Sequence, residues 1–456
     1  MSRASTPPPV RSFAVAVAAS LLLASIASAQ TAPVARQVTF SKDVAPILQR
    51  SCVNCHRPGE MAPMSLMTYE DARPWARAIK TRITTHEMPP FHIDKSIGIT
   101  SFKNDPSLSD AEIALIGAWV DQGAPRGNPA DMPPPRQFAD TSAWQFTPDV
   151  VVKFPAYKVP AAGPDLYGNL YADIPIAKDR YIQAIQTRAA TPGSRKVVHH
   201  ALTYAVDSDD KDVSGDDSAG VDGGDFLVEY ASGKNAEVYT GDSGVLLQAG
   251  KKAMVSYHLH SVGEETDAFI EVAMKLFPEG YTPKHIRWSK QLAQATSEID
   301  IPGGSVARID GYVVMHKAAR ILSFQPHMHI RGKRQCLELI YPTGGSAAKT
   351  EMISCTNFSY NWHLNYTYTD DAAPLIPAGT MLHVITWHDN SQSNKANPDP
   401  KNWVGDGQRT IDEMGFAWIG WYDMTDDEYK AELDARKTER QKKATTTQQQ
   451  QQGQQQ

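Results

Sequence analysis

The sequence predicts a multidomain protein in which a small all-α domain is followed by two all-β sandwich domains. The chain has 456 residues, of which 41% are hydrophobic, so it is long enough for several cores. Residues 38–125 carry apolar side chains at helical spacing. From Trp144 to Tyr422, short alternating runs are separated by clusters of Gly, Pro, Asn and Asp, which is typical of antiparallel sandwiches. This stretch is too long for one sandwich, and two are therefore expected.

The first 29 residues have the organisation of a secretory signal. Arg3 and Arg11 precede an apolar run at residues 13–26, and small residues follow at 27–29. We therefore expect cleavage after Ala29 and a periplasmic or secreted bacterial protein. The apolar run is shorter than the about 20 residues that a membrane-spanning helix needs, and no later segment comes close. No membrane span is expected.

Residues 38–125 form the predicted helical domain. Ser109 and Glu112 have the spacing of a capping box, at the start of a helix whose apolar face includes Trp119. The proline-dense segment 126–143 is predicted to be a linker.

A C-x-x-C-H motif lies within this helical domain. Two thiols flanking a two-residue spacer, here Cys52 and Cys55, reach the two vinyl groups of a haem, and the following His56 binds its iron. The motif therefore predicts a covalently attached haem c and a small cytochrome c domain. A structural zinc site is the alternative.

The sixth iron ligand is expected further along the same domain. Met88 is favoured, because Pro89 and Pro90 hold the chain extended and would present the thioether across the haem face. Methionine also raises the haem potential relative to two histidines. The other candidates are Met61, Met64, Met67, His86 and His92.

Two cysteines remain outside the haem motif. In an oxidising compartment Cys336 and Cys355 are expected to form a disulfide, the alternative being two buried thiols. The formal charge of −6 provides no excess of positive charge for phosphate backbones, which argues against nucleic acid as a partner.

The β region is predicted to divide between Gln291 and Ile301, giving sandwiches at 144–290 and 291–425. Residues 426–456 are expected to form a charged helix followed by a disordered glutamine-rich tail. The clearest strand-like runs are 196–205, 253–260, 268–276, 320–325, 337–341 and 381–388.

Three paired histidine clusters occur in strand-like contexts. Residues i and i+2 of a strand share a face, so His327 and His329 can chelate one ion, and His258 and His260 are a possible second pair. Adjacent His199 and His200 can act together only at a bulge or a strand end.

The clusters indicate a transition-metal site without fixing the metal. Imidazole suits copper, zinc, iron or nickel, and a thioether partner favours reduced copper. Met414 is a candidate for that thioether, although from composition alone it is more simply a core methionine.

Four segments in order resemble the motifs of the copper type II, ascorbate-dependent monooxygenases, which include peptidylglycine alpha-hydroxylating and dopamine beta-monooxygenases. The segments are Val198-His199-His200-Ala201, Val255-Ser256-Tyr257-His258-Leu259-His260, Pro326-His327-Met328-His329-Ile330-Arg331-Gly332 and Asp412-Glu413-Met414. Residues 38–125 also look like the haem domains fused ahead of bacterial relatives.

This resemblance implies two consecutive jelly-roll-like sandwiches that each provide one copper site across a solvent-filled cleft. His199, His200 and His258 would hold the electron-transferring copper. The catalytic copper, which activates dioxygen, would be held by His327, His329 and Met414. His260 is left without an assigned role.

The sequence departs from the peptide-amidating member at three positions that bind the carboxylate of its substrate. An arginine, an asparagine and a tyrosine of that member are replaced here by Gln325, Phe416 and Trp418. Without the arginine a carboxylate cannot be paired bidentately, so a less charged, non-peptide substrate is expected.

The sequence thus predicts a periplasmic haem–copper monooxygenase that uses dioxygen to hydroxylate a small organic substrate. Electrons from an ascorbate-like reductant or a periplasmic redox protein would pass through the haem to the histidine-bound copper and then to the methionine-bound copper. The alternatives are a non-catalytic electron-transfer or copper-binding protein, and a β scaffold with empty sites whose haem region docks on a respiratory partner.

Overall fold

The computed structural model describes residues 36–58, 60, 62–136, 144–207, 225–231, 236–293, 299–342, 349–407 and 409–453. The predicted signal segment lies outside these residues. Within them, no helix is both long enough and apolar enough to cross a membrane.

The helical segment that follows the N-terminal residues packs around Trp119, which is fully buried. One helix begins at the predicted capping residue: at the start of α4 (Asp110–Asp121) the Ser109 side chain accepts a hydrogen bond from the backbone N–H of Glu112, and the carboxylate of Glu112 accepts one from the backbone N–H of Ser109. Gly123 follows at φ +87°, a conformation that favours glycine. The elements are η1 (Phe40–Val44), α1 (Ala45–Ser51), α2 (Tyr69–Ala72), η2 (Arg73–Trp75), α3 (Ala76–Thr84), α4 (Asp110–Asp121) and η3 (Pro129–Asp131).

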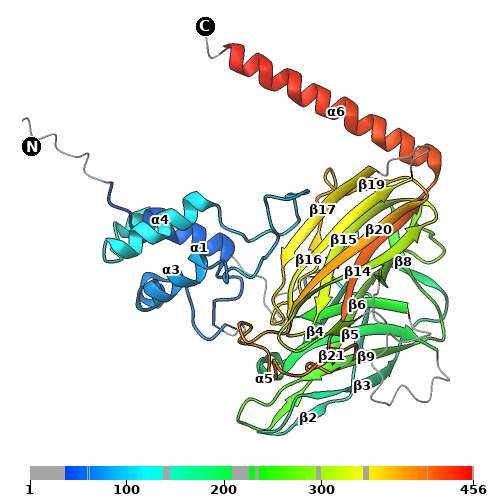
Figure 1. Ribbon diagram of the computed structural model, residues 1–456, viewed down its shortest axis with the longest axis horizontal. Helices are drawn as coiled ribbons and strands as arrows, with labels where there is room; N and C mark the ends of the chain where they lie inside the picture. Colours follow the sequence, from blue (N-terminus) through cyan, green and yellow to red (C-terminus); the bar gives the residue numbers. More distant parts are fainter. Residues whose placement is uncertain are drawn as a thin grey trace, which may run out of the picture. The chain divides into compact units, whose positions relative to one another are not determined.

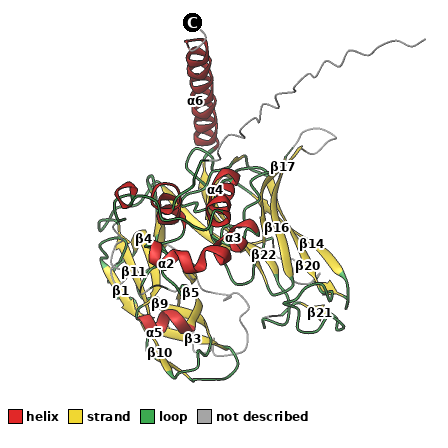
Figure 2. Ribbon diagram, turned by 90° about the vertical axis from the view of Figure 1, so that its left-hand side faces the viewer, coloured by secondary structure: helices red, strands yellow, loops and turns green. Residues whose placement is uncertain are grey.

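The rest of the described chain is mainly β-structure, as predicted, and Figure 2 shows its strands in yellow. The first sandwich packs the sheet β3-β9-β5-β6 against the strands β1-β11-β4-β8, with Ile182 and Val255 in the core between them. Its elements are β1 (Val150–Lys153), β2 (Tyr157–Val159), β3 (Leu166–Asp173), β4 (Arg180–Ala189), α5 (Pro192–Val197), β5 (Val198–Val206), β6 (Asp225–Ala231), β7 (Glu237–Val238), β8 (Ser243–Leu247), β9 (Lys252–Leu259), β10 (Thr266–Ala268) and β11 (Ile270–Leu276).

The second sandwich packs the sheet β14-β20-β16-β17 against the strands β12-β22-β15-β18, with Phe324 and Leu337 in its core. Figure 1 shows these strands in yellow to orange. The strands are β12 (His285–Leu292), β13 (Asp300–Ile301), β14 (Val306–Met315), β15 (Ala318–Met328), β16 (Gly332–Tyr341), β17 (Lys349–Asn357), β18 (Tyr366–Thr367), β19 (Leu375–Ile376), β20 (Thr380–Asp389), β21 (Val404–Gly405) and β22 (Gly415–Met424).

The two sandwiches share one continuous sheet. Strand β12 pairs antiparallel with β22 of the second sandwich, and its first residues pair parallel with β8 of the first. The predicted boundary at 290/291 therefore falls inside β12. A separate apolar cluster joins the sandwiches: Tyr204 and Met254 of the first pack with Phe416 and Trp418 of the second.

Residues 91–103, which we call the strap, leave the helical segment and join the second sandwich. Ile93 forms a β-bridge with Thr356, and the backbone N–H of Asn357 donates to the carbonyl of His92 at 2.9 Å. Further backbone hydrogen bonds join Asp94 to Cys355, Ile99 to Ile353, and Lys103 to Thr367. Because Ile93 and Phe102 are buried in the second core, the strap is part of that fold.

The last helix is longer than the sequence pattern indicates. Helix α6 (Asp426–Gly453) continues through the glutamine-rich residues, where a disordered tail is expected. Glutamine has a favourable helix propensity, and neither glycine nor proline interrupts residues 426–452. The charged first part of the helix therefore extends without a stop signal.

The predicted disulfide is present, between Cys336 of β16 and Cys355 of β17. We expect the double variant Cys336→Ala/Cys355→Ala to be less stable by about 2–4 kcal/mol. The disulfide joins residues 19 positions apart and so reduces the conformational entropy of the unfolded chain. Denaturant unfolding of both proteins under oxidising conditions measures the difference. Equal midpoints for the two proteins would contradict the prediction.

Candidate metal centres

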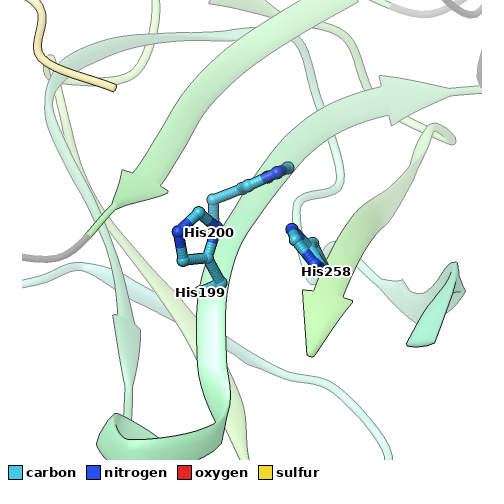
Figure 3. A group of neighbouring side chains, drawn as sticks. All are labelled: His199, His200 and His258. Atoms are coloured by element: carbon cyan, nitrogen blue, oxygen red, sulfur yellow. The ribbon is translucent and has the colours of Figure 1, made fainter. Parts of the chain in front are cut away.

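The first histidine group comes from two neighbouring strands of the first sandwich. His199 and His200 begin β5, directly after α5, and His258 lies near the end of β9 (Figure 3). The β5–β9 register shifts between Val198 and His200, which is the bulge that joint ligation by adjacent residues requires. As a result, each of the three imidazoles offers a ring nitrogen within 4.8 Å of the others.

His258 is buried and His199 and His200 are half-buried, and several of their ring nitrogens lack a hydrogen-bond partner. The Nδ1 atoms of His199 and His200 are buried and make no hydrogen bond, and neither ring nitrogen of His258 makes one. The carboxylate of Asp165 lies 3.0 Å from Nε2 of His258, but it is not aligned as a hydrogen bond. Unpaired buried nitrogens cost free energy unless a ligand satisfies them, so the group fits a metal ion.

Burial keeps this group neutral, the form that binds metals. Desolvation and the neighbouring imidazoles lower the pKa of His199 to about 4, and they lower the pKa of His200 well below its usual value. Desolvation also lowers the pKa of His258, against an opposing effect of Asp165. The nearby His260 donates its backbone N–H to Val197, and its ring centre lies 6.3 Å from that of His199.

The second histidine group lies on the strand pair β15–β22 of the second sandwich. His327 stands opposite Phe416 in this register, and Met328 stands opposite Gly415. Residues paired across a ladder point to the same face of the sheet, and so do residues i and i+2 of one strand. Met414 is therefore on the face that carries Phe416 and the two histidines. That face is the one that meets the first sandwich, because Met414 and Phe416 pack in the cluster with Tyr204.

Hydrogen bonds orient His329 for ligation. Its Nδ1 lies 3.1 Å from the carbonyl oxygen of Asp412, to which it can donate, which leaves Nε2 available for a metal. Its backbone N–H donates to a carboxylate oxygen of Glu413 at 3.0 Å. The other oxygen of Glu413 accepts the backbone N–H of Arg331 at 2.7 Å. Glu413 is fully buried, and burial raises its pKa to about 7.

A sixth histidine, which the sequence analysis does not single out, lies between the two groups. His363 belongs to the loop between β17 and β18, and its side chain is buried, with 4% of its surface exposed. Its ring centre lies 5.7 Å from that of His200 and 5.2 Å from that of His327. The resemblance implies a solvent-filled cleft between the two copper sites, and His363 lies between the two histidine groups. No motif signals it, because a single histidine in a loop carries little information.

The C-x-x-C-H residues form a tight turn at the end of α1. The backbone N–H groups of Cys55 and His56 both donate to the carbonyl of Cys52. Nδ1 of His56 lies 3.2 Å from the carbonyl oxygen of Met64, which leaves Nε2 free to bind an iron. The thiols of Cys52 and Cys55 are unbonded and partly buried, as covalent haem attachment needs. Met88 is half-buried, just before the strap.

One of the three positions that depart from the amidating enzyme contacts a buried carboxylate, and the other two make aromatic contacts. The side-chain amide of Gln325 donates to Glu229, and these two side chains are 2% and 5% exposed. Phe416 stacks on His327 with ring centres 4.4 Å apart, and Trp418 stacks on Phe226 at the same separation. Phe416 and Trp418 therefore make the region beside His327 largely apolar, and Gln325, at the arginine position, is bound to Glu229.

Comparison with known protein families and with curated proteins gives no match. Among solved structures, the chain is similar to the infectious bursal disease virus VP2 subviral particle, with 12% identity over 64% of this chain and 75% of that one, and a TM-score of 0.19. It is also similar to the tandem CBM22 domains of Xyn10C from Paenibacillus barcinonensis, with 9% identity over 61% of this chain and 80% of that one, and a TM-score of 0.17. At these TM-scores neither similarity bears on function.

Proposed function

We propose that the chain is an exported haem–copper monooxygenase that hydroxylates a small, uncharged or cationic organic substrate. The observation that carries the proposal is the pair of half-buried to buried histidine groups, which two sandwiches bring together on facing surfaces. The C-x-x-C-H turn in the same chain supports electron supply by a c-type haem.

The types of donor atom suggest which residues would hold each metal. His199, His200 and His258 would hold one copper, and His327, His329 and Met414 the other, while Cys52, Cys55, His56 and Met88 would hold the haem. Copper supplies one-electron redox chemistry and dioxygen activation, and the haem supplies single electrons. One dioxygen, two electrons and two protons convert a C–H bond to C–OH and release water.

The chain itself contributes exclusion of water and orientation of the ligands. Phe416 and Trp418 provide an apolar wall beside the second group. Tyr167 stacks on His258, and its hydroxyl is hydrogen-bonded to that of Thr410 at 2.7 Å, which covers the first group from solvent. Gln325, at the position of the arginine of the amidating member, donates to Glu229 and offers no guanidinium to a carboxylate substrate, which supports a non-peptide substrate.

Metal analysis and oxygen uptake test the proposal together. Purified, copper-loaded protein should contain one haem and two coppers per chain, and after reduction by ascorbate it should consume dioxygen when a metabolite extract is added. Mass spectrometry should then find a product heavier by one oxygen atom. Two coppers without any substrate-dependent uptake would favour a non-catalytic copper-binding or electron-transfer protein, and fewer than two would leave the second group unexplained.

The variant Cys52→Ser/Cys55→Ser should lose covalent haem and keep its copper, because the thiols lie in the helical segment and the histidine groups in the sandwiches. The pyridine haemochrome spectrum of the denatured protein measures the haem, and metal analysis measures the copper. Stopped-flow reduction with a haem-reducing protein should show slower loss of the cupric EPR signal. Copper reduction at the wild-type rate would exclude electron entry through the haem.

A further inference from the structure

His388 lies in the core of the second sandwich and reaches the backbone of Met414. It belongs to β20, in the sheet β14-β20-β16-β17, whereas Met414 directly precedes β22 of the opposite sheet. The His388 side chain is 0% exposed, and its Nε2 lies 3.1 Å from the carbonyl oxygen of Met414. One polar side chain therefore crosses the core to a residue that we assign to the second copper.

The imidazole of His388 lies behind the strand that follows the thioether. A Cβ added to Gly415, the first residue of β22, would lie 3.7 Å from Cε1 of His388. The Met414 side chain instead packs with Tyr204 of the first sandwich. His388 thus contacts the backbone of Met414 from the core, while the thioether lies at the interface between the sandwiches.

The hydrogen bond to Met414 fixes which ring nitrogen of His388 carries the proton. A carbonyl oxygen can only accept, so Nε2 is the donor and Nδ1 keeps a lone pair. The carboxylate of Glu413, 3.5 Å from Nε2, favours the same arrangement. Nδ1 is buried and has no hydrogen-bond partner among the described residues, which costs free energy. Phenylalanine would fill this place without that cost, so packing alone does not account for the histidine.

A second polar side chain of the same sheet holds the ligand-bearing strands in the same way. Gln335 of β16 is 0% exposed. Its side-chain amide nitrogen lies 3.0 Å from the carbonyl oxygen of Phe416 and 3.4 Å from that of His327. His327 and Phe416 are partners in the β15–β22 register. Two buried donors of one sheet therefore fix the backbone on both strands that present the second histidine group.

We propose that His388 is a positioning residue for Met414, which holds the thioether at the distance from His327 and His329 that joint binding of copper requires. A thioether is a neutral and weak ligand, so its contribution depends on where the backbone places it. Residues that orient metal ligands in this way change metal affinity by about 10–100-fold when they are replaced. The inference rests on the proposed function in requiring copper at the second group.

X-ray absorption at the copper edge of the reduced, copper-loaded protein tests this role. The wild-type spectrum should contain scattering from a sulfur neighbour, that of Met414. In His388→Phe the sulfur scattering should weaken, and competition with a cuprous chelator should show about 10–100-fold weaker binding of one copper. The copper of the first histidine group should keep its wild-type affinity.

His388→Gln is the rescue variant. The amide nitrogen of glutamine takes nearly the place of Nε2 of histidine and can donate to the Met414 carbonyl. The sulfur scattering and the copper affinity should therefore both return toward the wild-type values, which a loss of packing alone would not predict.

The matched control is His383→Phe, which removes another buried imidazole from β20. His383 is 5% exposed, and its ring nitrogens lie 2.7 Å from Asp310 and 2.8 Å from Glu338. Neither partner belongs to the second histidine group. This variant should lose stability in denaturant unfolding, yet keep the sulfur scattering and both copper affinities.

The outcomes separate this inference from the proposed function. Full sulfur scattering and wild-type copper affinity in His388→Phe would overturn the positioning role and leave the two-copper proposal intact. Equal weakening in His383→Phe would assign the effect to a general loss of stability, and so would also overturn the role. A wild-type protein with no sulfur neighbour at copper would overturn both proposals.

If His388→Phe fails to fold, His388→Asn decides. The shorter amide of asparagine takes nearly the place of Nδ1 and falls short of the Met414 carbonyl, so the same weakening of sulfur scattering is expected. Wild-type sulfur scattering in this variant would contradict the role of His388.

Discussion

Replacing Met414 with isoleucine should reduce substrate-dependent oxygen consumption by more than about 100-fold, because loss of even a supporting residue of a metal site costs 10–100-fold. Isoleucine keeps a similar apolar volume at this buried position of the sandwich interface but removes the thioether that favours reduced copper. Oxygen uptake of copper-loaded, ascorbate-reduced protein measures the effect.

The matched control for this change is Met254→Ile. Met254 is buried in the same apolar cluster, on β9 of the first sandwich. Its replacement should keep oxygen uptake within a few-fold of the wild type and cost at most about 1.5 kcal/mol of stability, as other volume-conserving swaps do. If both variants lost activity equally, packing of the interface and not the thioether would be the cause.

Replacing Glu413 with alanine should destabilise the protein by about 2–6 kcal/mol, because two buried backbone N–H groups lose their acceptor, at about 1–3 kcal/mol each. The carboxylate accepts the backbone N–H groups of His329 and Arg331, and alanine would leave both unsatisfied in a fully buried place. Denaturant unfolding of the metal-free proteins measures the loss. Glu413→Gln keeps an acceptor oxygen and should lose much less.

The same residue gives the metal-free protein a defined pH dependence. Burial raises the pKa of Glu413 to about 7, above its value of 4.5 in the unfolded chain. The folded state therefore binds the proton more tightly, and the stability that this group contributes is present below pH 4.5 and is lost as the pH rises through 7. In Glu413→Gln this part of the pH dependence should disappear, and an unchanged profile would assign it to other groups.

The sequence patterns that predicted most were those with a fixed geometric meaning. Alternation along strands predicted the β-rich region, and the need for a bulge at His199–His200 followed from strand geometry. The capping box at Ser109 was also predictable, because its hydrogen bonds are local. The disulfide followed from the expected compartment and the shortage of other cysteines.

The features that the sequence did not predict depend on contacts between distant segments. His363 reaches the two groups only because β17 and β18 bring its loop between the sandwiches, and no local pattern records this. The strap has no alternation of its own, and it pairs with β17 through residues more than two hundred positions away. Met414 could be assigned only through its resemblance to a motif, since a buried methionine is otherwise ordinary.

The strap also affects the kinetics of electron transfer from the haem to copper. Residues 85–90 join α3 to the strap and residues 104–109 join the strap to α4, and six extended residues reach at most about 20 Å. These two connections tether the helical segment to the second sandwich, which carries one of the two proposed copper sites. A haem on the helical segment would therefore be at a high effective concentration relative to that copper. Reduction of copper should then be first order in this protein, with a half-time that does not change on dilution.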